Sequence, residues 1–156
     1  MAGVQRFQDL ECHKLAVQIR REVLRLTCRE SVKREFRYVH QIRDAARSAA
    51  RNIAEGFSRF NPSEIVPYLS IVKGSLDEVR DEIKDGRESG YFSDDECDVV
   101  LDLVSRTIAA VMRWRRYLES PQARQFYERH KGTRRQRDYT PRTANRNPRT
   151  KNEPEP

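Results

Sequence analysis

Residues 41–56 read QIRDAARSAARNIAEG, and this stretch decides the fold of the chain. Its apolar residues recur at three- and four-residue steps, which is the period of a buried helix face. Most of them are alanines, so a neighbouring helix can approach this one closely. Gly56 closes the stretch and is expected to end the helix as the first residue beyond it. The apolar positions are Ile42, Ala46, Ala49, Ala50 and Ile53.

A second face of the same helix carries Arg43, Arg47 and Arg51 at four-residue steps. At about 1.5 Å rise per residue they would form a basic ridge roughly 12 Å long. Three guanidinium groups in a row can contact successive phosphates of one nucleic-acid strand. The alternative is a solvated face whose charges pair with Asp44, Glu55 or a neighbouring helix.

A third face is polar, with Ser48, Asn52 and Glu55 at positions i, i+4 and i+7. We interpret it as a network that fixes helix packing or a subunit contact, and that meets Ser75 and Glu78 of a later helix. A nucleophilic role for Ser48 is disfavoured, because the sequence places no histidine on this face to act as a base.

The flanking sequence predicts three more helices. Asp9 is expected to cap a first helix that runs to about Arg29, and a short polar joint then leads into the second helix near Arg34. The third helix shows an apolar seam of alternating four- and three-residue steps, and so does the fourth. The two seams are Ile65, Leu69, Val72, Leu76, Val79 and Ile83, then Val100, Leu103, Thr107, Val111, Trp114 and Leu118.

Local signals mark where these later helices begin and end. Asn61 is a predicted N-cap, followed by Pro62 at the first helical position and by Glu64, which can reach back to the cap. Residues 93–96, Ser-Asp-Asp-Glu, form a second predicted capping box. Gly86 and Gly90 mark the expected end of the third helix.

Four helices with short joints predict an all-α protein, an antiparallel up-down-up-down four-helix bundle over residues 1–119. Residues 120–156 form a basic C-terminal extension, with a short helix expected over 121–131 and a disordered tail after it. This extension holds ten Lys and Arg against four Asp and Glu residues, so it carries six of the chain's seven net positive charges.

Candidate contacts to nucleic acid also lie outside the second helix. Arg113 and Arg116 could extend a positive surface on the fourth helix, whereas Trp114 between them is expected in the core. A flexible polycation binds RNA through counterion release, although a merely solubilising tail is the alternative. The tail residues predicted to bind are Arg134, Arg135 and Arg137.

Other functional classes lack support in the sequence. No Glu-x-x-His pair or zinc-ligand spacing is present, so we expect no metal site, no cofactor and no catalytic residue. The odd number of cysteines, Cys12, Cys28 and Cys97, favours reduced thiols. No apolar run is long enough to span a membrane, and we expect a cytoplasmic protein.

Motifs along residues 6–119 resemble the four-helix-bundle proteins encoded in intervening sequences of 23S ribosomal RNA genes. Two positions depart from that pattern: Asp44 stands where an arginine is usual, and Lys73 where an alanine is usual. The residues that carry the resemblance are Phe7, Leu10, Lys14, Ala16, Gln41, Ala45, Ala46, Asn52 to Gly56, Tyr68 to Ser70, Gly74 to Leu76, Glu78, Gly90 and Tyr91.

The resemblance implies a function as well as a fold. Relatives of this family are accessory proteins of diversity-generating retroelements, in which a homopentameric ring holds a reverse transcriptase and its template RNA. This predicts a non-enzymatic, RNA-binding scaffold protein. The alternative is a protein–protein interaction module of the same family without specific RNA binding. A small nuclease is disfavoured, because neither a metal cluster nor a general base is evident.

Overall fold

The structure is a computed structural model that describes residues 6–59 and 61–129. The all-α prediction is confirmed, since the described residues form five α-helices and one short 3-10 helix, and no strand. The elements are η1 (Phe7–Asp9), α1 (Glu11–Thr27), α2 (Phe36–Phe57), α3 (Pro62–Glu88), α4 (Asp94–Leu118) and α5 (Pro121–Arg129).

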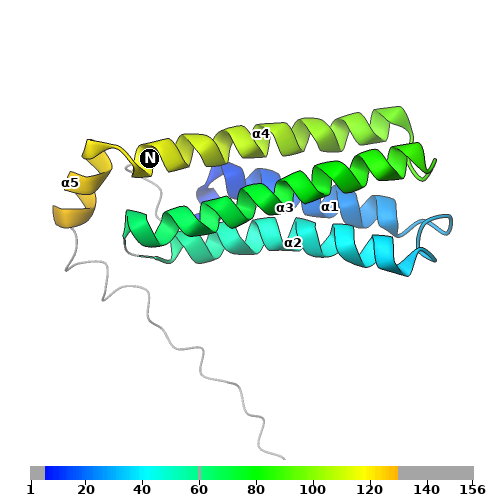
Figure 1. The fold of residues 1–156 in the computed structure, drawn as a ribbon, viewed down its shortest axis with the longest axis horizontal. Coiled ribbons are helices and arrows are strands. Elements are labelled where there is room, and N and C mark those ends of the chain that lie inside the picture. The colour runs from blue at the N-terminus through cyan, green and yellow to red at the C-terminus, as the bar shows by residue number, and fades with distance from the viewer. Residues whose placement is uncertain (1–5, 60, 130–156) are drawn as a thin grey trace, which may run out of the picture.

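The four long helices lie side by side, and short segments connect successive helices at alternate ends (Figure 1). Helix α2 packs against α1 and α3, and α4 packs against the same two helices from the other side. The short helix α5 turns across the end of the assembly, where it contacts α3 and α4. One face of α2 therefore stays exposed beside α3.

The core is built from the predicted seams. All six apolar positions predicted for α3 are buried, and so are all six positions predicted for α4. The small residues of α2 are buried as well, which brings its backbone close to its neighbours. Trp114 is 4% exposed and lies with its ring centroid 6.4 Å from that of Phe57, so it belongs to the core as predicted.

The start of α4 is capped as predicted. The backbone N–H of Glu96 donates to Ser93 Oγ at 3.4 Å, and the Ser93 N–H donates to Glu96 Oε2 at 3.2 Å. Glu96 also receives hydrogen bonds from Arg25 and Arg29 at the end of α1. The capping box therefore ties one end of α1 to the start of α4.

The predicted caps of the first and third helices differ from the structure. Asp9 lies in η1 and pairs with Arg6 at 3.2 Å, so Leu10 is the residue before α1 and its side chain makes no cap. Asn61 does precede α3, with Pro62 at the first turn, but its amide Nδ2 donates to Glu64 Oε1 at 2.6 Å. A carboxylate only accepts hydrogen bonds, so the Asn61 amide turns its NH₂ group toward Glu64. Its oxygen therefore does not cap the N–H groups of the helix.

Gly56 does not end α2, contrary to the prediction. It lies buried inside the helix, and a Cβ atom added to it would be 3.0 Å from Tyr68 Cβ of α3. The glycine therefore lets α2 and α3 approach closely here, and a side chain at this position would require Tyr68 to shift. Gly90, by contrast, has φ of 71° and follows α3 in a Schellman motif, with Tyr91 N–H bonded to Gly86 C=O at 2.8 Å.

Helix α5 forms over Pro121–Arg129, close to the predicted span of 121–131. Ala123 is buried, and Tyr127 packs against the core. Arg134, Arg135 and Arg137, with the rest of the predicted tail, lie outside the described residues.

Candidate nucleic-acid interface

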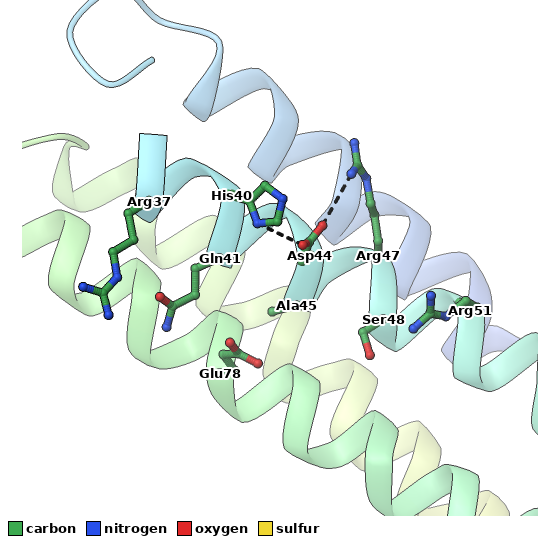
Figure 2. A pocket seen from close by; sticks show the side chains of 9 residues that line it. All are labelled: Arg37, His40, Gln41, Asp44, Ala45, Arg47, Ser48, Arg51 and Glu78. Carbon is green, nitrogen blue, oxygen red and sulfur yellow. Dashed lines mark hydrogen bonds and ion pairs between the residues drawn. The ribbon is translucent and has the colours of Figure 1, made fainter. Parts of the chain in front are cut away.

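The exposed face of α2 forms an open groove of about 800 Å³ beside α3. Figure 2 shows the residues that line it, eight from α2 and one from α3. Three of them are arginines, two are acidic and the remainder are polar or small. They are Arg37, His40, Gln41, Asp44, Ala45, Arg47, Ser48, Arg51 and Glu78.

The predicted ridge of three arginines divides into two groups. Arg43 turns away from the groove: its Nε donates to Thr27 Oγ1 at 2.7 Å and its Nη2 to Cys28 Sγ at 3.4 Å. It therefore joins α2 to the end of α1. Arg47 and Arg51 line the groove and are exposed.

Arg37 is a groove residue that the sequence analysis missed. It lies seven residues before Asp44 and fourteen before Arg51, so all three fall on nearly the same face of the helix. At about 1.5 Å per residue, Arg37 and Arg51 are roughly 21 Å apart along the axis. The signal in the sequence is this seven-residue spacing, which returns to nearly the same helix face after two turns.

The charges of the groove are only partly compensated. Asp44 lies 3.0 Å from His40 Nδ1 through one oxygen and 3.5 Å from Arg47 Nη1 through the other. Arg37 and Arg51 make no hydrogen bond or ion pair with any residue that the structure describes. The groove thus has an uncompensated guanidinium group at each end and a partly neutralised centre.

Only some of the polar residues predicted to form one network, Ser48, Asn52, Glu55, Ser75 and Glu78, contact one another in the structure. Ser48 Oγ accepts hydrogen bonds from Ser75 Oγ at 2.8 Å and from Asn52 Nδ2 at 3.1 Å, so three of these side chains join α2 to α3. Glu78 lines the groove one turn further along α3 (Figure 2). Glu55 is not part of this set, because it pairs with Arg59 at the end of α2.

The structure corrects one step of the argument against catalysis. His40 lines the same groove as Ser48, although the sequence analysis placed no histidine on that face. Eight residues of helix separate the two, or about 12 Å, which is well beyond hydrogen-bond reach. His40 Nδ1 faces Asp44, and Ser48 Oγ already accepts two hydrogen bonds. The pair is not arranged as a base and a nucleophile.

The arginines of α4 lie away from this groove, because α4 packs against α1 and α3 and not against α2. Arg113 forms an ion pair of 3.1 Å with Glu11 of α1. Arg116 is exposed near the end of α4. They do not extend the surface formed by Arg37 and Arg51.

Three further features bear on the class of site. Within residues 6–59 and 61–129, no three His, Cys, Asp or Glu side chains gather as ligands for a metal ion. None of the described helices is both long and apolar enough to cross a membrane. The three cysteines are free, with Cys12 and Cys97 buried and Cys28 exposed.

Comparison with models of protein families gives a match. The model of a protein family described as 23S rRNA-intervening sequence protein matches residues 8–113, more than half of the chain. This segment includes α1, α2, α3 and most of α4, so the whole groove lies inside it. A search of curated proteins found no match.

Proposed function

The chain belongs to the family of 23S rRNA-intervening sequence proteins, and from that premise we propose that it is a non-enzymatic, RNA-binding accessory protein. The observation that carries the proposal is the pair Arg37 and Arg51, exposed and uncompensated at the two ends of one open groove. In this proposal the four long helices act as an antiparallel up-down-up-down bundle. The bundle presents the groove on one face.

Phosphate is the ligand that this arrangement favours. A guanidinium group offers planar, charge-assisted hydrogen bonds that suit phosphate oxygens. A separation of roughly 21 Å spans several successive phosphates of an RNA strand, so one strand can engage both arginines. The basic residues after residue 129 would add contacts with little sequence preference.

We also propose a cytoplasmic homopentamer as the working assembly, on the basis of the family resemblance. Five copies would present five grooves, and the weak contacts of each would add through multivalency. A reverse transcriptase of a retroelement is the protein partner for which such a scaffold would hold RNA. Light scattering of the full chain in solution tests the stoichiometry directly.

The test of RNA binding is a double charge reversal, Arg37→Glu with Arg51→Glu. We expect its affinity for a labelled single-stranded RNA at low salt to fall by about tenfold or more. The slope of log K against log salt should become shallower by about 1.4, because two phosphate contacts are lost. Fluorescence anisotropy across a salt series measures both quantities.

The matched control is Arg20→Glu with Arg21→Glu, which changes the net charge equally at two exposed residues of α1. This variant should keep most of the affinity and the original slope. Circular dichroism should show the same helicity for both variants. Equal losses in the two variants would show that only net charge matters, and an unchanged R37E/R51E double variant would remove the groove from the binding site.

A protein–protein interaction module is the second candidate, and a specific observation favours it. Phe36 is 80% exposed at the start of α2, next to Arg37, and aromatic side chains are enriched at protein–protein interfaces. Asp44 and Glu78 also place negative charge inside the groove. Absence of salt-dependent RNA binding by the full chain would favour this candidate.

A further inference from the structure

The groove offers more than phosphate contacts. Among the side chains between Arg37 and Arg51, Gln41, Ser48 and Glu78 are not required for phosphate recognition, and Glu78, unlike Asp44, has no described ionic partner (Figure 2). A neutral amide and a hydroxyl are common on any helix surface. A carboxylate between two uncompensated cations is different, because it repels the same phosphates that the arginines attract.

Glu78 is available to a ligand. It is exposed on α3 and makes no hydrogen bond or ion pair with a residue in the described ranges. One turn earlier, a Cβ atom added at Gly74 would meet nothing within 4 Å, so the surface of α3 is open at that residue. An ionised carboxylate accepts hydrogen bonds and donates none, so it selects for N–H or O–H groups.

Ser48, by contrast, is already engaged by its neighbours. Its oxygen contacts Ser75 Oγ and accepts a hydrogen bond from Asn52. Glu78 is therefore the groove's unpaired acceptor, and the amide of Gln41, which also lines the groove, can donate or accept.

We propose that this groove holds an unstacked base of a bound RNA strand, and that Glu78 selects bases with an exocyclic amino group over uracil. The inference rests on the proposed RNA-binding function and names a specificity-determining residue for it. A cytosine presents its N4 amino group to a carboxylate, which is a known pairing of base and side chain. Uracil has a carbonyl oxygen at that position, and its one N–H lies between two carbonyl oxygens that repel a carboxylate.

The experiment compares twelve-nucleotide oligomers of cytidine and of uridine, which have equal length, charge and ring size. We expect the protein to bind the cytidine oligomer at least about five-fold more tightly than the uridine oligomer. In Glu78→Gln the glutamine can donate to the uracil carbonyl, so uridine binding should rise and the ratio should fall toward one. Glu88→Gln, an exposed carboxylate of α3 outside the groove, should keep the original ratio.

The outcomes separate this inference from the proposed function. Equal affinities of the original protein for both oligomers, or a ratio that E78Q leaves unchanged, would overturn the selective role of Glu78 while RNA binding stands. Failure to bind either oligomer at low salt would overturn the proposed function itself. A uridine preference in the original protein would contradict the assignment of Glu78 as an acceptor.

Discussion

Arginines of one sequence pattern have different roles in the structure. Arg43 is held by Thr27 and Cys28 and connects two helices, whereas Arg51, eight residues later, faces solvent without a described partner. An ideal helix turns by about 100° per residue, so a four-residue series drifts around its surface. The start of the series meets α1 and its end reaches the groove. Residue type alone does not distinguish an arginine that joins two helices from one that stays exposed without a described partner.

The effect of replacing a glycine also depends on its surroundings in the fold, and this gives a prediction about stability. A Cβ atom at Gly86 would collide with Tyr38 Oη and would lie 2.6 Å from the Phe92 ring, whereas one at Gly74 meets open space. We expect Gly86→Ala to lower the free energy of unfolding by about 1–3 kcal/mol through overpacking. We expect Gly74→Ala to raise it by up to about 1 kcal/mol through helix propensity.

Urea denaturation followed by circular dichroism measures both glycine variants. The Tyr38 hydroxyl donates to the Glu82 carbonyl oxygen at 2.7 Å, so it cannot move aside without losing that hydrogen bond. Equal stabilisation of the two variants would show that the aromatic residues around Gly86 rearrange freely.

At the scale of the elements, Glu96 links the start of α4 to the end of α1. The Arg29 guanidinium, with the Ser93 N–H and Arg25, lowers the pKa of Glu96 to about 2. A pKa lowered by folding means that the folded state favours the ionised carboxylate. The resulting stabilisation is fully present above the ordinary glutamate pKa of about 4.5 and is lost as the pH falls toward 2.

The variant Glu96→Gln isolates this charge, because glutamine also fits a capping box. We expect it to lower the free energy of unfolding by about 1 kcal/mol at pH 7. The difference from the original protein should shrink as the pH falls from 5 to 2. Glu88→Gln serves as the control and should have little effect at any pH. A difference for E96Q that stays constant with pH would show that the charge of Glu96 does not stabilise the fold.

Element boundaries show which local signals are reliable. The capping box at Ser93 appears as predicted, since a serine and a glutamate three residues apart satisfy each other's backbone groups without help from the rest of the chain. Asp9 failed as a cap because Arg6 lies within reach of its carboxylate. Where two partners compete for one side chain, the sequence does not rank them.

At the scale of the whole molecule, the groove and the basic extension are separable in the proposed function. Ending the chain at residue 129 removes eight Lys and Arg residues. We expect this truncated chain to bind RNA more weakly and with a shallower salt slope. The loss caused by Arg37→Glu with Arg51→Glu should persist in the truncated chain.

A salt series on the four proteins, full and truncated, with and without the double substitution, measures both contributions. Independent sites predict that their free-energy effects add. A truncated chain that binds no RNA would assign all binding to the residues after 129. A truncated chain with unchanged affinity and slope would assign it to the helical body.

The sequence by itself determined the helices, their buried seams and the all-α class, because helical periodicity and capping are local properties of a dozen or so residues. It also indicated that α2 carries the polar and basic surface. Only the tertiary structure decided which members of that surface share one groove. Arg43 lies outside the groove and bonds Thr27 at the end of α1, whereas Arg37, His40 and Glu78 line the groove. The physical reason is that the packing of α1 and α3 against α2 determines which of its side chains are covered. This packing depends on contacts between segments far apart in the chain.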